Sequence, residues 1–367
     1  MHLYIHVPFC QRRCSYCDFS IAVRKRIPAR EYVDVILKDA RGSDVEKLET
    51  IYFGGGTPSL LPPEAIAQLL RGLLADPVAP GDREVTLEAN PEDVTPDRAR
   101  AWRAAGINRV SLGAQSFDDH VLKWMHRSHD AARIGAAVHA LRGMGIENIS
   151  LDLIFALPDE LQRDWERDLD MALALRPPHL SLYGLTVEPR TPLDRWISRG
   201  ATHAPDEERY ADEYLIAHRR LTADSYQFYE VSNASLPGFR SQHNSAYWSG
   251  KAYVGLGPAA HSFDGRTRRW NLRAWEAYRR ALAEGRSTVE SEETLTVEQR
   301  ELEAMYLGLR TIEGIAVAAL RRPSPPPHLA AQGWIFEHAG RLKCTPEGWL
   351  RLDSLVNELT MHTETQS

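Results

Sequence analysis

The chain has 367 residues, which is long for one domain and enough for two. Its hydrophobic (43%) and charged (26%) fractions are ordinary for a globular protein, and a net charge of −6 gives no overall basic surface for nucleic acid. No run of about 18 apolar residues predicts a membrane span. The N-terminus shows no signal-peptide pattern, so we expect a cytoplasmic protein.

Short apolar runs alternate with helical segments through the first half of the chain. We predict strands at 2–7, 49–53, 84–89, 109–114, 149–155 and 179–185, and helices at 28–41, 62–75, 95–105, 130–144 and 164–175. This alternation indicates an α/β fold, in which right-handed crossovers curl a parallel sheet into a partial (β/α)6 barrel. In such sheets, ligands bind at the carboxyl ends of the strands.

The alternation loosens after Pro192. Helices are expected at 206–223, 276–285 and 297–309. A proline-rich break at 323–327 then separates them from a C-terminal tail that ends in a helix at 346–359. We therefore predict three parts: a barrel at 1–200, an extension at 201–285, and a small C-terminal α/β domain of winged-helix type at 286–367.

Three cysteines lie close together directly after the first strand. Cys10, Cys14 and Cys17 have the spacing C-x3-C-x2-C. On a [4Fe-4S] cubane, three thiolates leave one iron without a protein ligand, and that iron can chelate the amino and carboxylate groups of S-adenosylmethionine (SAM). Two alternatives remain on the cysteines alone: a zinc site completed by His6 or Cys344, and unrelated thiols.

Other polar residues fall at or just past the ends of predicted strands, where the same ligand would bind. Taken singly, each polar side chain is more readily explained as a surface or capping residue, and the glycines as a tight turn, but together they outline a polar ring. They are Gly54, Gly55, Gly56 and Thr57 after the second strand, Glu88 after the third, and Gln115, Arg127 and Asp152.

These motifs resemble the HemN/HemW family of radical SAM proteins, which contains oxygen-independent coproporphyrinogen III oxidases and heme chaperones. The resemblance covers nearly the whole chain. It implies that residues 54–57, Glu88, Gln115, Arg127 and Asp152 contact SAM. It also implies that Tyr4 lies beside the methionyl group of SAM and that Tyr16 lies near its adenine.

The sequence is more similar to the chaperone subgroup than to the oxidases. The oxidases carry a further cysteine where this chain has Phe19, and they have a segment before the first strand, which here begins at residue 2. The chaperones carry an H-N-x-x-Y-W motif, and this chain has His243-Asn-Ser-Ala-Tyr247-Trp248. His243 is the candidate heme ligand, with Tyr247 and Trp248 as flat apolar surface; the alternative is a structural histidine in an aromatic patch, with His261 and His6 as competing ligands.

The resemblance implies a heme chaperone with three cofactors, a [4Fe-4S] cluster, SAM and heme, which delivers heme to respiratory hemoproteins at the membrane. It suggests a homodimer and a location peripheral to the membrane. The alternatives are a coproporphyrinogen III oxidase, a radical SAM enzyme that opens heme anaerobically, and a cluster-dependent regulator. Because of Phe19, we do not expect coproporphyrinogen dehydrogenase activity.

Overall fold

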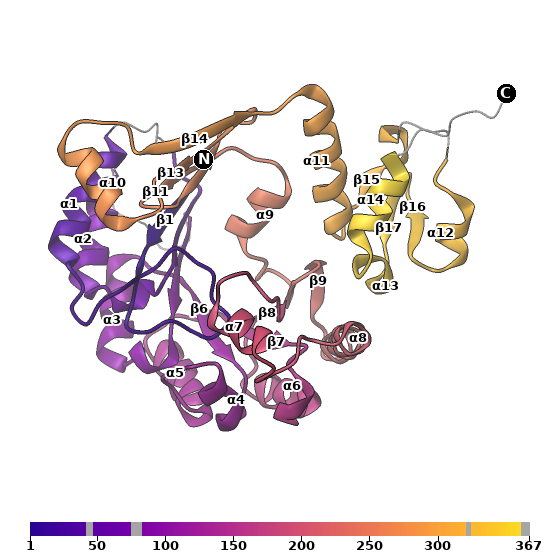
Figure 1. Ribbon diagram of the computed structural model, residues 1–367, viewed down its shortest axis with the longest axis horizontal. Coiled ribbons are helices and arrows are strands. Elements are labelled where there is room, and N and C mark those ends of the chain that lie inside the picture. Colours follow the sequence, from indigo (N-terminus) through magenta and orange to yellow (C-terminus); the bar gives the residue numbers. More distant parts are fainter. Residues whose placement is uncertain (42–46, 75–82, 321–323, 361–367) are drawn as a thin grey trace.

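One large sheet organises most of the protein. The computed structural model describes residues 1–41, 47–74, 83–320 and 324–360 (Figure 1). The sheet has twelve strands in the order β14-β13-β12-β11-β1-β4-β5-β6-β7-β8-β10-β9. Its central strands run parallel, and strands from the second half of the chain extend it at both edges with antiparallel pairs.

The parallel centre is the predicted partial barrel. Its strands are β1 (His2–Val7), β4 (Thr50–Gly55), β5 (Glu84–Ala89), β6 (Arg109–Gln115), β7 (Asn148–Phe155) and β8 (His179–Gly184). The connecting helices are α1 (Ala29–Ala40), α2 (Pro63–Leu73), α3 (Pro96–Ala105), α5 (Ala131–Gly143) and α6 (Trp165–Ala174), and they lie on the outside of the sheet (Figure 1). The predicted fold class is confirmed; the predicted end of the second helix at residue 75 lies outside the described residues.

Side-chain caps explain where these helices begin. The side chains of Thr95, Asp130 and Asp164 each accept a hydrogen bond from the backbone N–H three residues later, at the start of α3, α5 and α6. Gly106, with φ +111°, ends α3 in the left-handed region. The three caps fix where these helices begin, and Gly106 fixes where α3 ends.

The parallel strands alternate between two kinds of buried side chain. Leucine, isoleucine, valine and phenylalanine point outward and pack under the helices, as in Leu3, Ile5 and Val7 of β1. The residues between them are polar, although many are equally buried: His2 and His6 (β1), Thr50 (β4), Glu84 and Thr86 (β5), Arg109 and Ser111 (β6), Ser150 (β7), and His179 and Ser181 (β8). Because successive side chains of a strand face opposite sides, the inner face of the barrel is polar.

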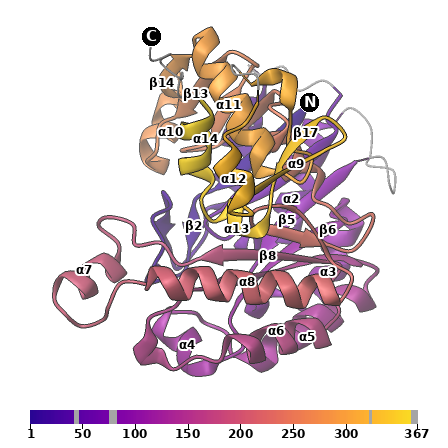
Figure 2. The ribbon, with the colours of Figure 1, turned by 90° about the vertical axis from the view of Figure 1, so that its right-hand side faces the viewer.

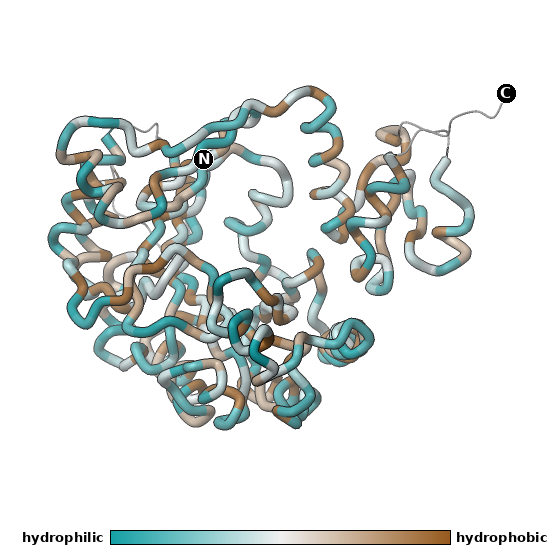
Figure 3. Tube along the Cα trace, viewed as in Figure 1, coloured by the Kyte–Doolittle hydropathy of each residue, from teal (hydrophilic) through white to brown (hydrophobic). Residues whose placement is uncertain are grey.

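The extension of the sheet was not predicted. On one edge, β11 (Tyr253–Leu256) runs parallel to β1 and is followed by the antiparallel strands β12 (His261–Phe263), β13 (Thr267–Asn271) and β14 (Val289–Thr294); on the other edge lie β10 (Asn233–Ser235) and β9 (Gln227–Glu230). The outermost strand β14 is exposed along its whole length and hydrophilic (Figure 3). Charged edge strands of this kind disfavour pairing with another chain.

The second half of the chain adds helices on several sides of the sheet. α8 (Glu207–Ala223), the long helix seen from the side in Figure 2, packs against β7 and β9, whereas α10 (Trp275–Ala283) packs against α1. α11 (Val297–Arg310) leads away from the sheet toward the C-terminal unit (Figure 1). Four short helices were missed by the sequence analysis: α4 (Asp119–Trp124), α7 (Pro192–Ser198), α9 (Gln242–Trp248) and α12 (Pro327–Ala331).

A three-stranded antiparallel sheet forms the core of the C-terminal unit. Its order is β15 (Ile315–Ala316), β17 (Arg341–Cys344) and β16 (Ile335–His338), with α12 (Pro327–Ala331) beside it. The helix predicted at 346–359 is two helices, α13 (Pro346–Trp349) and α14 (Leu352–Thr360). The short α13 is anchored to α11, because the Trp349 indole donates a hydrogen bond to the Leu309 carbonyl (3.0 Å).

The predicted division of the chain at residues 200 and 285 stays a prediction. β14, which falls within the predicted C-terminal domain at 286–367, lies in the large sheet. Among the described residues, no helix combines the length and apolar character needed to cross a membrane.

Candidate functional site

Backbone contacts fix both ends and the middle of the cysteine loop. The loop leaves β1 and forms a short parallel pair, β2 (Phe9–Cys10) with β3 (Ala22–Val23). In its middle, the Ser15 N–H donates to the Met125 carbonyl after α4, and the Ser15 carbonyl accepts from Leu193 of α7 (2.8 Å). Two of the helices that the sequence analysis missed therefore hold this loop.

The three thiols open onto one cavity of about 420 Å³ at the carboxyl ends of the parallel strands. The Thr57 hydroxyl donates to Cys10 Sγ (3.3 Å), and Arg127 Nη1 donates to Cys14 Sγ (3.5 Å). Burial, together with the neighbouring thiols, raises the pKa of Cys10 to about 11, against the effect of the Thr57 hydroxyl. Burial also raises the pKa of Cys17. The three side chains are thus brought together in a partly desolvated setting.

The glycine turn after β4 lets the surrounding side chains approach closely. Gly55 has φ +109°, and a Cβ there would lie 2.7 Å from the His6 ring. A Cβ on Gly56 would lie 3.0 Å from Cys10 Sγ, and one on Gly54 would lie 2.8 Å from the Tyr4 ring. Glycine is required at these positions because larger residues would displace the wall that carries the first cysteine.

Glu88 lies at the end of β5 beside the glycine turn. Its carboxylate accepts hydrogen bonds from the Tyr52 hydroxyl (2.8 Å) and from the Gly55 N–H (3.1 Å). Desolvation raises the pKa of Glu88 to about 7, with Asp152 adding to the rise and the Tyr52 hydrogen bond opposing it. The charge of Glu88 therefore changes near neutral pH.

Gln115, Arg127 and Asp152 line the same cavity. A Cβ on Gly113 would lie 3.0 Å from Gln115 Nε2 and 3.1 Å from Arg127 Nη2, so both side chains converge above this glycine. Arg127 also donates to the Asn90 side chain (2.6 Å). Asp152 accepts from the Ser111 hydroxyl (3.0 Å). The predicted polar ring is thus spread over β5, β6, β7 and the loop after α4.

Two predicted SAM contacts lie elsewhere. Tyr16 lines the cysteine cavity, but Tyr4 faces a neighbouring cavity, stacks on Tyr52 (ring centroids 6.0 Å apart) and contacts His6 Nδ1 through its hydroxyl (3.2 Å). Gly54 packs against Tyr4 and Tyr52 and is not among the residues that line the cysteine cavity.

The residues proposed as a fourth zinc ligand are engaged elsewhere. The two ring nitrogens of His6 contact the Tyr4 hydroxyl and the Ser20 carbonyl (3.3 Å). Cys344 is buried in the C-terminal sheet, where burial raises the pKa of its thiol to about 12. In the described part of the chain, no group of three or more His, Cys, Asp or Glu side chains lies close enough together to hold a single metal ion; Cys10, Cys14 and Cys17 line one cavity without forming such a group.

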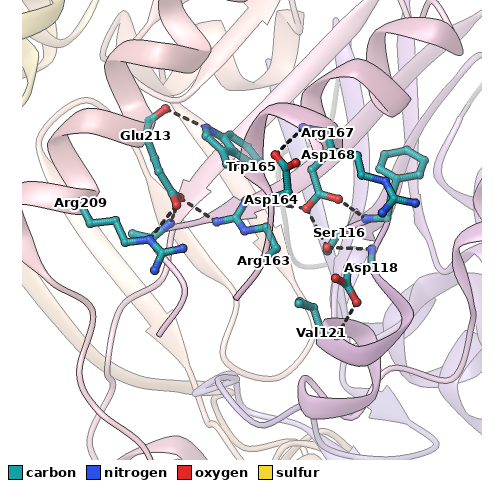
Figure 4. A network of polar contacts seen from close by, with 12 residues as sticks. Ser116, Asp118, Val121, Arg163, Asp164, Trp165, Arg167, Asp168, Arg209 and Glu213 are labelled. Carbon is teal, nitrogen blue, oxygen red and sulfur yellow. Dashed lines mark hydrogen bonds and ion pairs between the residues drawn. The ribbon is translucent and has the colours of Figure 1, made fainter. Parts of the chain in front are cut away.

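A buried ionic network, not foreseen from the sequence, joins α6 and α8 to the loops after β6 and β7 (Figure 4). Arg163 donates to Glu213 of α8 (2.7 Å) and lies 3.7 Å from Asp168 of α6. Glu213 also accepts from the Ala156 N–H after β7 (2.7 Å), and Asp168 accepts from the Ser116 hydroxyl after β6 (2.7 Å). The network therefore holds the loops that directly follow Gln115 and the end of β7.

The H-N-x-x-Y-W motif lies on α9, which enters the barrel from the amino ends of the strands. Glu84, at the start of β5, accepts the backbone N–H groups of Gln242 (2.9 Å) and His243 (3.0 Å) at the start of the helix. The two ring nitrogens of His243 contact the hydroxyls of Thr50 (2.7 Å) and Tyr247 (2.9 Å). His243 is 1% exposed, and burial lowers its pKa to about 3. The role of His243 as a heme ligand stays a prediction.

A second cavity, of about 920 Å³, lies beside the first. It is bounded by β1, by β11–β14 and by the ends of α9 and α11, and it shares Asp18, Phe19 and Gly55 with the cysteine cavity. Its wall is rich in aromatic rings, including Tyr247, Trp248, Tyr253, Phe263 and Trp270. Tyr247 and Trp248 both line this cavity, whereas His243 does not.

The partial barrel with three cysteines at the carboxyl ends of its strands defines a radical SAM protein. In agreement, the sequence model of the Radical SAM superfamily matches residues 4–172. The heme chaperone HemW of Escherichia coli K12 is 36% identical, over 97% of each chain. HemW of Mycobacterium tuberculosis H37Rv is also 36% identical, over 97% of this chain and 94% of the relative. The chain belongs to the HemW family of radical SAM proteins.

Two further proteins are similar over most of their length. The mitochondrial radical S-adenosyl methionine domain-containing protein 1 of Mus musculus is 33% identical, over 96% of this chain and 86% of the relative. The solved structure of E. coli coproporphyrinogen III oxidase (HemN), a radical SAM enzyme, superposes with a TM-score of 0.80, covering 98% of this chain and 89% of the oxidase. At 21% identity, this likeness concerns the fold.

Radical SAM membership implies a [4Fe-4S] cluster and SAM, and the site fits both. Cys10, Cys14 and Cys17 would hold the cluster, because three thiols converge on one cavity with polar groups opposite them. Together, the two groups supply one-electron chemistry when bound. The chain's own contribution is placement: Arg127 would offset thiolate charge beside Cys14, and Glu88 would present a carboxylate to a cationic ligand.

Proposed function

We propose that this protein is a heme chaperone on a radical SAM scaffold, which binds a [4Fe-4S] cluster, SAM and heme and delivers heme to membrane-associated hemoproteins. The observation that carries the proposal is the aromatic cavity of about 920 Å³ next to the cysteine cavity. Ligand sites typically have volumes of about 300–1,000 Å³ and predominantly apolar walls, which suits a porphyrin. Near-full-length similarity to proteins named heme chaperones supports the same reading.

Heme titration followed by transfer tests this function. We expect the anaerobically reconstituted full chain to bind heme stoichiometrically. It should then restore heme absorbance in membranes from heme-deficient cells faster than heme bound to serum albumin. A chain that binds no heme, or transfers it no faster than albumin does, contradicts the proposal. Size-exclusion chromatography with and without the cluster tests the accompanying proposal of a homodimer.

A coproporphyrinogen III oxidase is the second candidate, because the chain shares its fold with the E. coli oxidase. Phe19, which is 56% exposed at the rim of both cavities, stands where the oxidases are expected to carry a cysteine. We therefore expect no conversion of coproporphyrinogen III under anaerobic, reduced and SAM-replete conditions. Robust formation of the decarboxylated product would favour the oxidase instead.

A further inference from the structure

The aromatic cavity contains a histidine that is free to bind a metal. His261 lies on β12, is exposed, and stacks on Trp270 of the neighbouring strand β13, with ring centroids 5.9 Å apart at an interplanar angle of 24°. Among the described residues, no hydrogen bond to its imidazole is formed. His243, in contrast, would have to break its contacts with Thr50 and Tyr247 and leave the barrel interior to reach a ligand in this cavity.

Resting on the proposed function, we propose that His261 is the axial ligand of a heme held in the aromatic cavity. An iron porphyrin needs a neutral imidazole at the metal and flat apolar surface around the ring. His261 supplies the first, and Trp270, Tyr253 and Phe19 on the cavity wall supply the second.

The charges around His261 fit the remaining part of such a ligand. Burial, Arg268 and Arg273 lower the pKa of His261, which keeps the imidazole neutral at neutral pH. Arg268 pairs with Glu303, and Lys251 pairs with Glu49 (3.4 Å), so neither is a free cation. Arg273 lines the cavity and forms no ion pair within the described residues. It is therefore the side chain available to a heme propionate, whereas Glu290 and Glu293 make their side of the cavity unfavourable for that group.

Hemin titration of single variants of the full, anaerobically reconstituted chain tests the assignment by difference absorbance. His261→Ala should shift the Soret band and weaken hemin binding by about tenfold or more, since even disturbing the outer partner of a metal-bound histidine costs about 10–100-fold. His243→Gln, which keeps a polar side chain in the barrel, should retain the Soret band of the parent. His203→Ala removes an exposed histidine outside both cavities and is the matched control.

Two further measurements separate loss of the ligand from loss of the cavity. Metal-free protoporphyrin IX needs no axial ligand, so its affinity should be the same for His261→Ala and the parent. His261→Met should replace nitrogen with sulfur at the iron and change the Soret position rather than abolish binding. An unchanged Soret band and hemin affinity in both His261 variants would overturn the assignment. Failure of the parent chain to bind hemin would instead overturn the proposed function.

Discussion

Replacing Glu88 with glutamine should remove a pH dependence from SAM binding. Glu88 faces the cysteine cavity with a pKa of about 7, and its charged form would attract the positively charged groups of SAM bound there. Because Glu88 carries a carboxyl group, it is mostly neutral below this pKa and mostly negatively charged above it. The attraction is present above about pH 7 and is lost as the pH falls below it.

The size of the effect follows from the fraction of Glu88 that is ionised. With a pKa of about 7, roughly one tenth of the carboxyl groups are charged at pH 6 and nine tenths at pH 8. If SAM binds the charged form, its affinity rises about tenfold over this interval, or ~1.4 kcal/mol. The charged and titratable groups that face Glu88 are Tyr52 on β4, Arg109 on β6, Asp152 on β7, Tyr183 on β8, Tyr4 on β1 and Tyr247 on α9.

Equilibrium dialysis of SAM against the reconstituted protein between pH 6 and 8 measures this dependence. The difference between the parent and Glu88→Gln profiles isolates the Glu88 contribution, because titration of SAM itself is common to both. Glu188→Gln removes another carboxylate of the same cavity and should keep the parent profile. Parallel profiles for the parent and Glu88→Gln would refute the reasoning.

Three more changes probe the rest of the site. Alanine at Cys10, Cys14 or Cys17 should abolish the iron–sulfur absorbance, whereas Cys344→Ala should preserve it; iron retained by a triple variant would argue for other ligands. Gly55→Val should cost about 1–3 kcal/mol of stability in backbone strain and weaken SAM binding, as measured by thermal unfolding and dialysis, because φ is +109° and His6 is 2.7 Å away. Glu213→Ala leaves Arg163 without its 2.7 Å partner and should cost about 3–5 kcal/mol, with faster hydrogen exchange in the loops after β6 and β7; unchanged exchange there would exclude the supporting role.

Local signals were sufficient for the parallel half of the fold. The strands alternate with period two, and the side chains of Asp130 and Asp164 cap the helices where the sequence predicts it. The spacing of Cys10, Cys14 and Cys17 was sufficient to predict that their thiols face one site. The same alternation, which repeats from His2 in β1 to Ser181 in β8, also indicates the polar inner face of the barrel.

Most of the features that the sequence analysis missed depend on contacts between residues that are distant in the sequence. α9 has only seven residues and no apolar stripe of its own, and it is held by Glu84 on β5, which lies about 160 positions earlier. Arg163 and Glu213 meet across 50 positions. The hairpin of β12 and β13 is different: its turn contains Asp264-Gly265, with φ +94° at the glycine, and this pair is a recognised hairpin signal. That signal could have placed His261 and Trp270 on adjacent strands.

The two cavities have Asp18, Phe19 and Gly55 in common, so SAM and a porphyrin, bound as proposed, would share three wall residues. Any coupling between the two ligands is then reciprocal: whatever factor SAM imposes on porphyrin affinity, porphyrin must impose on SAM affinity. Porphyrin titrations with and without SAM would measure that factor.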